Sequence, residues 1–423
     1  MPMNRFLGPV AARYASIAVQ FGVVAVITRA LDQHDAGNYF VTMGFVTATY
    51  FIAGLGLPDG VVRYAPALMA TGRESEGRAL LRGGLRYSLL TIPIGAGITG
   101  CAIGIYLGAT DVGILSGVWW GCYGVIFVCA QSLVASSRSE LGTAVFYSAA
   151  SAGQLLISVP MIVLGHLDRL DSVLMAMVLG TAAAACVSVA IALRLRAHAS
   201  GAAIGPETLR GVWQQGMLIA VGRVAQSCLI WSPVWVVSMT LGASDAALVG
   251  LASRLVNAVA AVLAAVRFSI RPSLAQDAAQ GNWRTIETQS SRIAAFATTL
   301  SVTAALAMAT IGEPLIAFLF GPAYRGVGII TAIMLISTIG ESLGGPVDEV
   351  LRMSGHAREV ILAQLVVLVV AFAAQAFVAL HAGLHAAVAT YGLMYVALFA
   401  IFIGRLHRLH GILIAPRLLA IPR

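Results

Sequence analysis

Long apolar stretches, separated by short segments that hold charged residues, glycine or proline, recur along the whole chain. About 20 mostly apolar residues are enough for a helix to cross the hydrocarbon core of a membrane. Dividing the chain at its polar breaks predicts an all-α integral membrane protein with about twelve transmembrane helices. The predicted spans are 7–31, 38–57, 84–108, 112–135, 142–166, 171–194, 213–241, 246–268, 292–311, 326–346, 359–380 and 384–405.

The composition supports lipid as the solvent of this chain. Of its 423 residues, 59% are hydrophobic and only 10% are charged, whereas soluble domains carry about 25% charged residues. The five cysteines all lie inside apolar runs without ligand-like spacing, so we predict no disulfide, no metal site and no bound cofactor. They are Cys101, Cys122, Cys129, Cys186 and Cys228.

Arginine supplies all 26 basic residues, and its distribution predicts the orientation. With twelve spans, 20 arginines fall on the side that holds both termini and three fall on the other side. Because positive residues accumulate in cytoplasmic connections, we expect both termini to be cytoplasmic. The net charge of +8 is then a matter of topology, and nucleic acid is not an expected partner.

The two halves of the chain resemble each other. Arg13 and Arg223 open the first and seventh spans, and Asp35 and Asp245 follow those spans at the same offset of 210 positions. Chance similarity between apolar helices is the alternative explanation. A repeat with six spans in each half predicts two pseudo-symmetric six-helix bundles around a central cavity, an arrangement typical of alternating access. We place them at residues 1–200 and 201–423.

The connections between spans are too short for a catalytic or ATP-hydrolysing domain, and no GxxxxGK[ST] motif is present. We therefore expect a transporter rather than an enzyme. Its driving force would be an ion gradient, with the ion unknown, or the concentration difference of the substrate itself.

Several short motifs resemble one family of transporters. They are R-x-L-x5-G-x-Y within 28–39, GLGLPDGVVR at 54–63, GEPLIAFLFGPAY at 312–324, GHAR at 355–358 and LHAAVAT at 384–390. In order and at these spans, they resemble the polysaccharide or O-antigen flippases (Wzx type) of the multidrug/oligosaccharidyl-lipid/polysaccharide (MOP) exporter superfamily. The last motif departs from the family pattern, which usually has Gly-x-x-Gly-Ala-Ala there.

The resemblance implies a function and a location. Such flippases carry undecaprenyl-diphosphate-linked oligosaccharide repeat units from the cytoplasmic to the periplasmic leaflet of the bacterial inner membrane. The expected partners are the lipid-linked oligosaccharide and membrane lipid. A polysaccharide polymerase and glycosyltransferases are further candidate partners. The resemblance leaves open which sugar is carried, and whether the product is O-antigen, capsule or exopolysaccharide.

Three arginines inside predicted spans are the main candidates for binding this substrate. An arginine at the centre of a bilayer costs about 2.5–3.5 kcal/mol on insertion scales, so such residues usually face a polar cavity or a partner. No acidic residue lies in the same spans, and arginine binds phosphate bidentately. We therefore expect a cationic cavity for the pyrophosphate group; the alternative is that these side chains extend to the lipid head groups. The candidates, with polar neighbours on the same helix faces, are Arg13 with Gln20, Arg223 with Gln226, and Arg254 with Asn257.

Three further residues are weaker candidates. Trp231 and Trp235 flank Pro233 in the seventh span and are candidates for stacking on sugar rings, although tryptophans at such positions more often pack between helices. Glu341, near the end of the tenth span, is a candidate for ion coupling; the alternative is an ordinary boundary carboxylate.

Other classes of membrane protein remain as alternatives. A multidrug antiporter of the same superfamily is the first, although we expect such a protein to carry carboxylates in its core, where this chain has arginines. A major-facilitator transporter would show a G-x-x-x-D-R-x-G-R-R motif, of which Asp59 to Arg63 are only a faint echo. A membrane polysaccharide polymerase or glycosyltransferase would usually have a large periplasmic loop.

Overall fold

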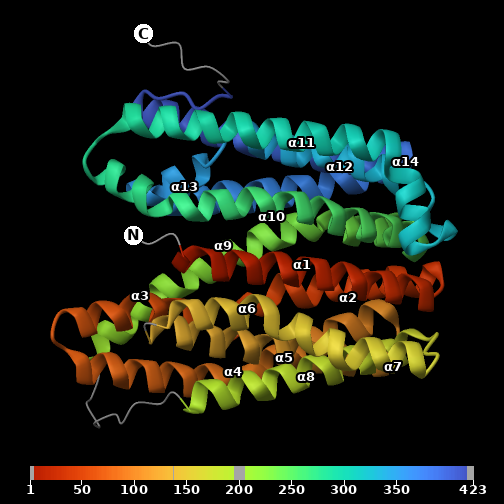
Figure 1. Cartoon of the computed structure of the whole chain (residues 1–423), viewed down its shortest axis with the longest axis horizontal. Coiled ribbons are helices and arrows are strands. Elements are labelled where there is room, and N and C mark those ends of the chain that lie inside the picture. The colour runs from red at the N-terminus through yellow and green to blue at the C-terminus, as the bar shows by residue number, and fades with distance from the viewer. Residues whose placement is uncertain (1–3, 137, 195–204, 417–423) are drawn as a thin grey trace. The chain divides into compact units, whose positions relative to one another are not determined.

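A computed structural model describes residues 4–136, 138–194 and 205–416 of the chain. Within these residues every regular element is a helix (Figure 1). Three arginines of the charge count, Arg196, Arg417 and Arg423, lie outside the described residues. The side chains of Arg5, Arg267 and Arg271 are not described either.

The first of two compact units comprises Met1–Cys228. Its long helices lie side by side with their axes roughly parallel (Figure 1). A π-helical turn, Gln154–Ser158, joins two of them into one continuous rod. The helices are α1 (Asn4–Ala30), α2 (Gln33–Thr49), α3 (Leu57–Ala70), α4 (Glu74–Leu107), α5 (Thr110–Ala135), α6 (Ser139–Gly153), α7 (Val159–Leu164), α8 (Leu170–Arg194) and the first two thirds of α9 (Pro206–Thr240).

The second unit comprises Leu229–Arg423. It holds the end of α9, a second set of long helices and one short helix (Figure 1). The helices are α10 (Ala243–Ala279), α11 (Trp283–Phe320), α12 (Val327–Leu343), α13 (Val347–Leu351) and α14 (Ala357–His410).

The all-helical membrane fold predicted from the sequence is confirmed. Among the described residues, eight helices are long and apolar enough to cross a membrane. The longest, α14, contains two predicted spans, because Gly383 (φ 76°, ψ −169°) leaves the helical conformation between them. Glycine tolerates such backbone angles, so the chain turns there without a side-chain clash.

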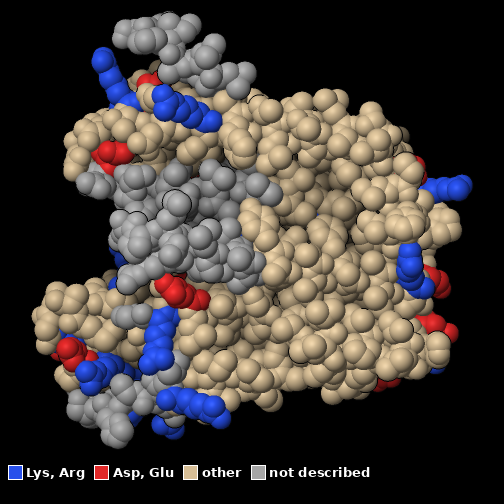
Figure 2. Space-filling view, viewed as in Figure 1, with Lys and Arg blue, Asp and Glu red and all other residues tan. Residues whose placement is uncertain are grey.

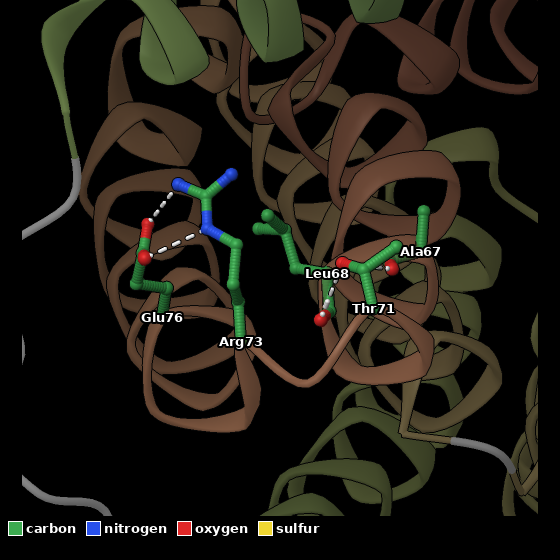
Figure 3. Close-up of polar contacts among 5 residues, drawn as sticks. All are labelled: Ala67, Leu68, Thr71, Arg73 and Glu76. Carbon is green, nitrogen blue, oxygen red and sulfur yellow. Dashed lines mark hydrogen bonds and ion pairs between the residues drawn. The ribbon is translucent and has the colours of Figure 1, made fainter.

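Two predicted connections are wrong. The predicted spans imply loops over 58–83 and 269–291, but the structure forms α3 and begins α4 at Glu74 in the first. In the second, α10 continues to Ala279 and α11 begins at Trp283. Hydropathy misses α3 because the helix is amphipathic: Val61 and Ala65 are buried, whereas Arg63 is exposed. The turn after it is closed by polar contacts (Figure 3): the Thr71 hydroxyl donates to the carbonyls of Ala67 and Leu68 at 3.1 and 3.0 Å, and Arg73 binds Glu76 with 2.8 and 2.6 Å bonds.

The molecular surface has the character expected of a protein in lipid. Large apolar side chains such as Ile105, Phe318 and Val369 are exposed to 70% or more. On the face shown in Figure 2, charged side chains gather towards the ends of the helices, and the surface between is formed almost wholly by other residues. Apolar surface of this extent would be unfavourable in water and is favourable against hydrocarbon.

The GEP motif at 312–314 has a structural role. Glu313 accepts hydrogen bonds from the backbone N–H of Gly326 and, at 3.3 Å, of Gly328. These are orphan donors at the start of α12, so the carboxylate caps that helix and complements its dipole. Gly312 and Gly328 let α11 and α12 approach closely, since a Cβ on Gly312 would lie 3.3 Å from the Gly328 Cα.

Helices α3 and α9 meet at an unusually short backbone distance. A Cβ added at Gly60 would lie 2.1 Å from the Val212 carbonyl oxygen, and one added at Gly216 would lie 2.0 Å from the Gly56 carbonyl oxygen. Only glycine fits at these positions, because any side chain would push the two helices apart. The first part of α9 is thereby fixed against α3 within the first unit.

We expect Gly60→Ala to destabilise the protein by about 1–3 kcal/mol, the usual cost of overpacking a close contact. The measurement is the thermal unfolding midpoint of the purified protein in detergent. Gly83→Ala is the matched control, because a Cβ there meets nothing within 4 Å, and it should be neutral or stabilising by about 0.5–1 kcal/mol. Equal midpoints for Gly60→Ala and the wild type would contradict the close packing.

Candidate functional site

A buried carboxylate lies at the start of α3. The chain leaves α2 through a 3-10 turn and then three residues with positive φ, Gly54 (77°), Leu55 (50°) and Gly56 (75°). This reversal starts α3 at Leu57 and places Asp59 in its first turn, where the helix dipole favours a negative charge. The side chain of Asp59 is only 2% exposed. A carboxylate so deeply buried needs a partner.

The partner of Asp59 is one of the arginines singled out by the sequence. Arg223 Nη1 lies 2.9 Å from Asp59 Oδ1. The same oxygen accepts a 2.7 Å hydrogen bond from Nε2 of Gln131 on α5. The other carboxylate oxygen, Oδ2, is buried and has no hydrogen-bond partner among the described residues. The arrangement is therefore a one-sided ion pair in which a single oxygen carries both contacts.

Aromatic rings flank the cation of this pair. The guanidinium carbon of Arg223 lies 5.8 Å from the ring centre of Phe51 and 5.9 Å from that of Phe127. These two rings pack edge to face at 5.7 Å. Yet the Arg223 side chain is 39% exposed. The cation thus has one face on a buried carboxylate, apolar flanks, and a part that a ligand can reach.

The local packing of α9 explains the position of Arg223. Gly216 contacts α3, and its neighbour Gln215 accepts a 3.2 Å hydrogen bond from Arg63 of α3. Arg223 follows Gly216 by seven residues, which is two helical turns on the same face. Because Val212 meets Gly60 and Gly216 meets Gly56, α9 runs antiparallel to α3. Arg223 therefore lies near the N-terminal end of α3, where it reaches Asp59.

The sequence has no acidic residue inside the spans of the three arginines, and Asp59, which pairs with Arg223, lies just outside a predicted span. In the sequence, Asp59 and Arg63 show only a faint likeness to a transporter motif, and in the structure Arg63 binds Gln215. The missed signal was an acidic residue directly after a glycine-rich break in an apolar stretch. Its partner could not be inferred, because it comes from a helix far away in the sequence.

The polar face predicted for the first span exists and contacts α6. The Ser16 hydroxyl lies 2.6 Å from both the Tyr147 carbonyl oxygen and the Ser151 hydroxyl, and Gln20 Nε2 donates to Ser151 at 3.3 Å. The guanidinium carbon of Arg13 lies 5.1 Å from the ring centre of Tyr147. Ser16 and Gln20 therefore join two helices, which is a structural role.

The third arginine, Arg254, belongs to the second unit. Its guanidinium carbon lies 5.2 Å from the ring centre of Trp231. Trp231 and Trp235 are each only 4% exposed, and Trp235 stacks on Phe372 at 6.1 Å. In this structure neither tryptophan presents an open ring face to a sugar. Gln226 on α9 and Asn257 on α10 are half-buried.

Pro233 interrupts the hydrogen bonding of α9 and is compensated locally. Proline has no N–H to donate to the carbonyl four residues earlier, which is that of Leu229. The Ser232 hydroxyl donates to this oxygen at 2.9 Å. Gln375 of α14 in turn donates to Ser232 at 3.0 Å. This buried network satisfies the backbone at the proline.

Glu341, the coupling candidate, is half-buried on α12. It interacts electrostatically with Tyr391 and Tyr395 of α14, whose rings lie 5.1 Å apart. Glu341 is thus a carboxylate beside two tyrosines of the second unit. Across the described residues, no group of three or more His, Cys, Asp and Glu side chains could hold a metal ion.

Comparison with known proteins identifies the fold. No family model matches the chain, and no curated protein matches its sequence. Solved structures do match. An inward-facing multidrug resistance MATE family transporter of the MOP superfamily has a TM-score of 0.76 at 12% identity, covering 94% of each chain.

Two further structures give similar values. A MOP superfamily transporter from Pyrococcus furiosus, described as having a binding pocket of reverse polarity that suggests a different function, has a TM-score of 0.69 at 11% identity and covers 96% of this chain and 95% of its own. The MATE multidrug transporter DinF-BH, in the structure of a complex, has a TM-score of 0.69 at 12% identity, covering 96% of each chain. The chain therefore has the multi-span helical fold of these transporters.

We expect a double-mutant cycle with Asp59→Asn and Arg223→Gln to give a coupling free energy of about 1.5–3 kcal/mol, near the lower end because Arg223 is partly exposed. The measurement is the free energy of unfolding in detergent for the two single variants and the double variant. The matched control is the exposed pair Arg405–Glu359, 2.5 Å apart, for which we expect a much smaller coupling because solvent screens it. Equal coupling in both cycles would contradict a buried ion pair at Asp59.

Proposed function

We propose that this chain is a flippase that carries undecaprenyl-diphosphate-linked oligosaccharide repeat units from the cytoplasmic to the periplasmic leaflet of a bacterial inner membrane. The single observation that carries the proposal is Arg223, a partly exposed guanidinium held within an apolar helical unit. The fold, shared with MOP superfamily transporters, supports movement of a substrate across the membrane. The sequence motifs that resemble polysaccharide flippases support the substrate class.

The chemistry of the substrate suits this site. A polyprenyl diphosphate carries its negative charge close to the lipid tail, so it must pass a protein surface that offers cations at membrane depth. A guanidinium binds phosphate through two parallel hydrogen bonds and is less strongly hydrated than an ammonium. The flanking rings of Phe51 and Phe127 shield part of the cation from water, which strengthens its electrostatic attraction on that side.

The remaining features of the proposal follow from the sequence. Both termini are cytoplasmic, and the halves 1–200 and 201–423 alternate access to a cavity between them. Arg13 and Arg223 capture the pyrophosphate first, and Arg254 engages it later. Glycosyltransferases supply the substrate and a polysaccharide polymerase consumes it. The energy comes from an ion gradient or from the substrate's own concentration difference.

The second candidate function is a multidrug antiporter. The observation that favours it is Asp59, which is a buried carboxylate. We expect a multidrug antiporter of this superfamily to carry carboxylates in its core. Several structural neighbours are described as multidrug transporters. One structural neighbour is described as having a binding pocket of reverse polarity, which suggests a different function. This description supports the view that the fold can serve substrates of either charge.

We expect the wild-type chain to restore glycan export in a bacterium that lacks its own flippase. Arg223→Ala should lower export by at least about tenfold, because it removes a charge-assisted contact worth about 1.5–3 kcal/mol. Arg13→Ala and Arg254→Ala test the other two cations. The readout is surface glycan at matched membrane protein levels. Arg284→Ala is the control, since it removes an exposed arginine near the start of α11.

Two outcomes would contradict the proposal. One is full export by all three variants at normal protein levels. The other is failure of the wild type to restore export while the same chain protects cells against cationic dyes and loses that protection in Asp59→Asn. The second outcome would support the antiporter.

A further inference from the structure

Arg223 contacts a buried carboxylate on one side and is exposed on another. Its Nη1 lies 2.9 Å from the buried Asp59 Oδ1, while 39% of its side chain is exposed. The cation is therefore held by an internal anion and is also accessible from outside. A residue in this situation can exchange one anionic partner for another without a change in the backbone.

The ion pair is incomplete on the side of the carboxylate. Arginine and carboxylate can form two parallel hydrogen bonds, but Asp59 meets Arg223 through Oδ1. Its Oδ2 is buried and has no hydrogen-bond partner in the described part of the chain. A buried acceptor without a donor costs free energy. The pair is thus weaker than its burial would suggest, and a ligand that offers two oxygens can compete with it.

The surroundings allow Arg223 to leave while Asp59 stays. Gln131 donates to Asp59 Oδ1 at 2.7 Å, and the first turn of α3 supplies a favourable dipole, so the carboxylate keeps two stabilising contacts. The rings of Phe51 and Phe127 lie beside the guanidinium and give it an apolar surface on which to move. The mobile partner is the arginine.

We propose that Asp59 is the resident counter-ion of Arg223, and that the diphosphate head group of the substrate must displace it. This inference rests on the proposed function. Because Asp59 and the ligand compete for Arg223, the site selects ligands by their negative charge; we call this a charge filter. A bilayer presents many singly charged phosphodiesters, which would occupy an unpaired arginine. A diphosphate carries more charge and more oxygens, so it displaces Asp59 where a single phosphodiester does not.

The test uses the full chain purified in detergent and isothermal titration calorimetry. The probes are farnesyl diphosphate, inorganic pyrophosphate and phosphatidylglycerol, which separate a lipid-borne diphosphate, a free diphosphate and a singly charged lipid. The variants are Asp59→Asn, Arg223→Gln and the double variant. The control is Glu76→Gln, which also removes one negative charge and releases an arginine, Arg73, but at an exposed turn.

We expect Asp59→Asn to lower the Kd for farnesyl diphosphate roughly tenfold, as expected for the loss of one competing charge-assisted contact. It should also acquire measurable binding of phosphatidylglycerol. The double variant should lose both gains, and Glu76→Gln should match the wild type. If Asp59→Asn also lowers the Kd for inorganic pyrophosphate, the diphosphate alone is sufficient. If it lowers the Kd for farnesyl diphosphate only, the lipid chain contributes to binding. Either supports the proposal.

Unchanged or weaker binding by Asp59→Asn would overturn the proposal, because Asp59 would then orient Arg223 rather than compete for it. A gain that persists in the double variant would overturn it too, since the released cation would not be Arg223. If neither the wild type nor any variant binds a diphosphate, the proposed function itself fails. If the wild type binds and only the effect of Asp59→Asn is missing, the function stands without the filter.

Discussion

A positive charge inside an apolar helical unit must be stabilised by the protein itself, and the three arginines inside the predicted spans share one kind of contact. Arg13, Arg223 and Arg254 each lie within 6 Å of an aromatic ring centre. A cation over an aromatic face gains about 0.5–1 kcal/mol at an exposed site and about 2 kcal/mol or more where water is excluded. This gain offsets part of the insertion cost of about 2.5–3.5 kcal/mol per arginine. Arg223 adds a salt bridge to the buried carboxylate of Asp59.

The position of that salt bridge depends on backbone packing more than on the charges. Gly60 and Gly216 let α3 and α9 come so close that a methyl group would not fit between them. In lipid there is little hydrophobic force between helices, so small residues and close van der Waals contact hold them together. Once the helices are fixed, Arg223 and Asp59 face each other. The ion pair then forms at a small cost in side-chain conformational entropy.

The fold could be predicted from the sequence because it follows from local properties. Span length and the distribution of arginines require no knowledge of tertiary contacts, and they led to an all-helical multi-span protein. The pair Asp59–Arg223 could not be predicted in this way, because it joins α3 to α9, and α3 itself was assigned to a loop. Amphipathic helices bury only one face, so their mean hydropathy resembles that of a connection. The polar stripe of Ser16 and Gln20 was recognised, but whether such a stripe faces a cavity or a neighbouring helix depends on packing.

The motifs and the charges carry different kinds of information about function. Glu313 of the GEP motif caps α12, so this motif reports how the fold is built and says little about the substrate. The substrate class rests on the ion pair, which both candidate functions can use in opposite ways. An antiporter for cations would expose the carboxylate and keep the arginine as its internal competitor. A carrier of anions would expose the arginine and keep the carboxylate inside. The Asp59 side chain is 2% exposed and that of Arg223 is 39% exposed. The accessible member of the pair is the cation, which favours an anionic substrate.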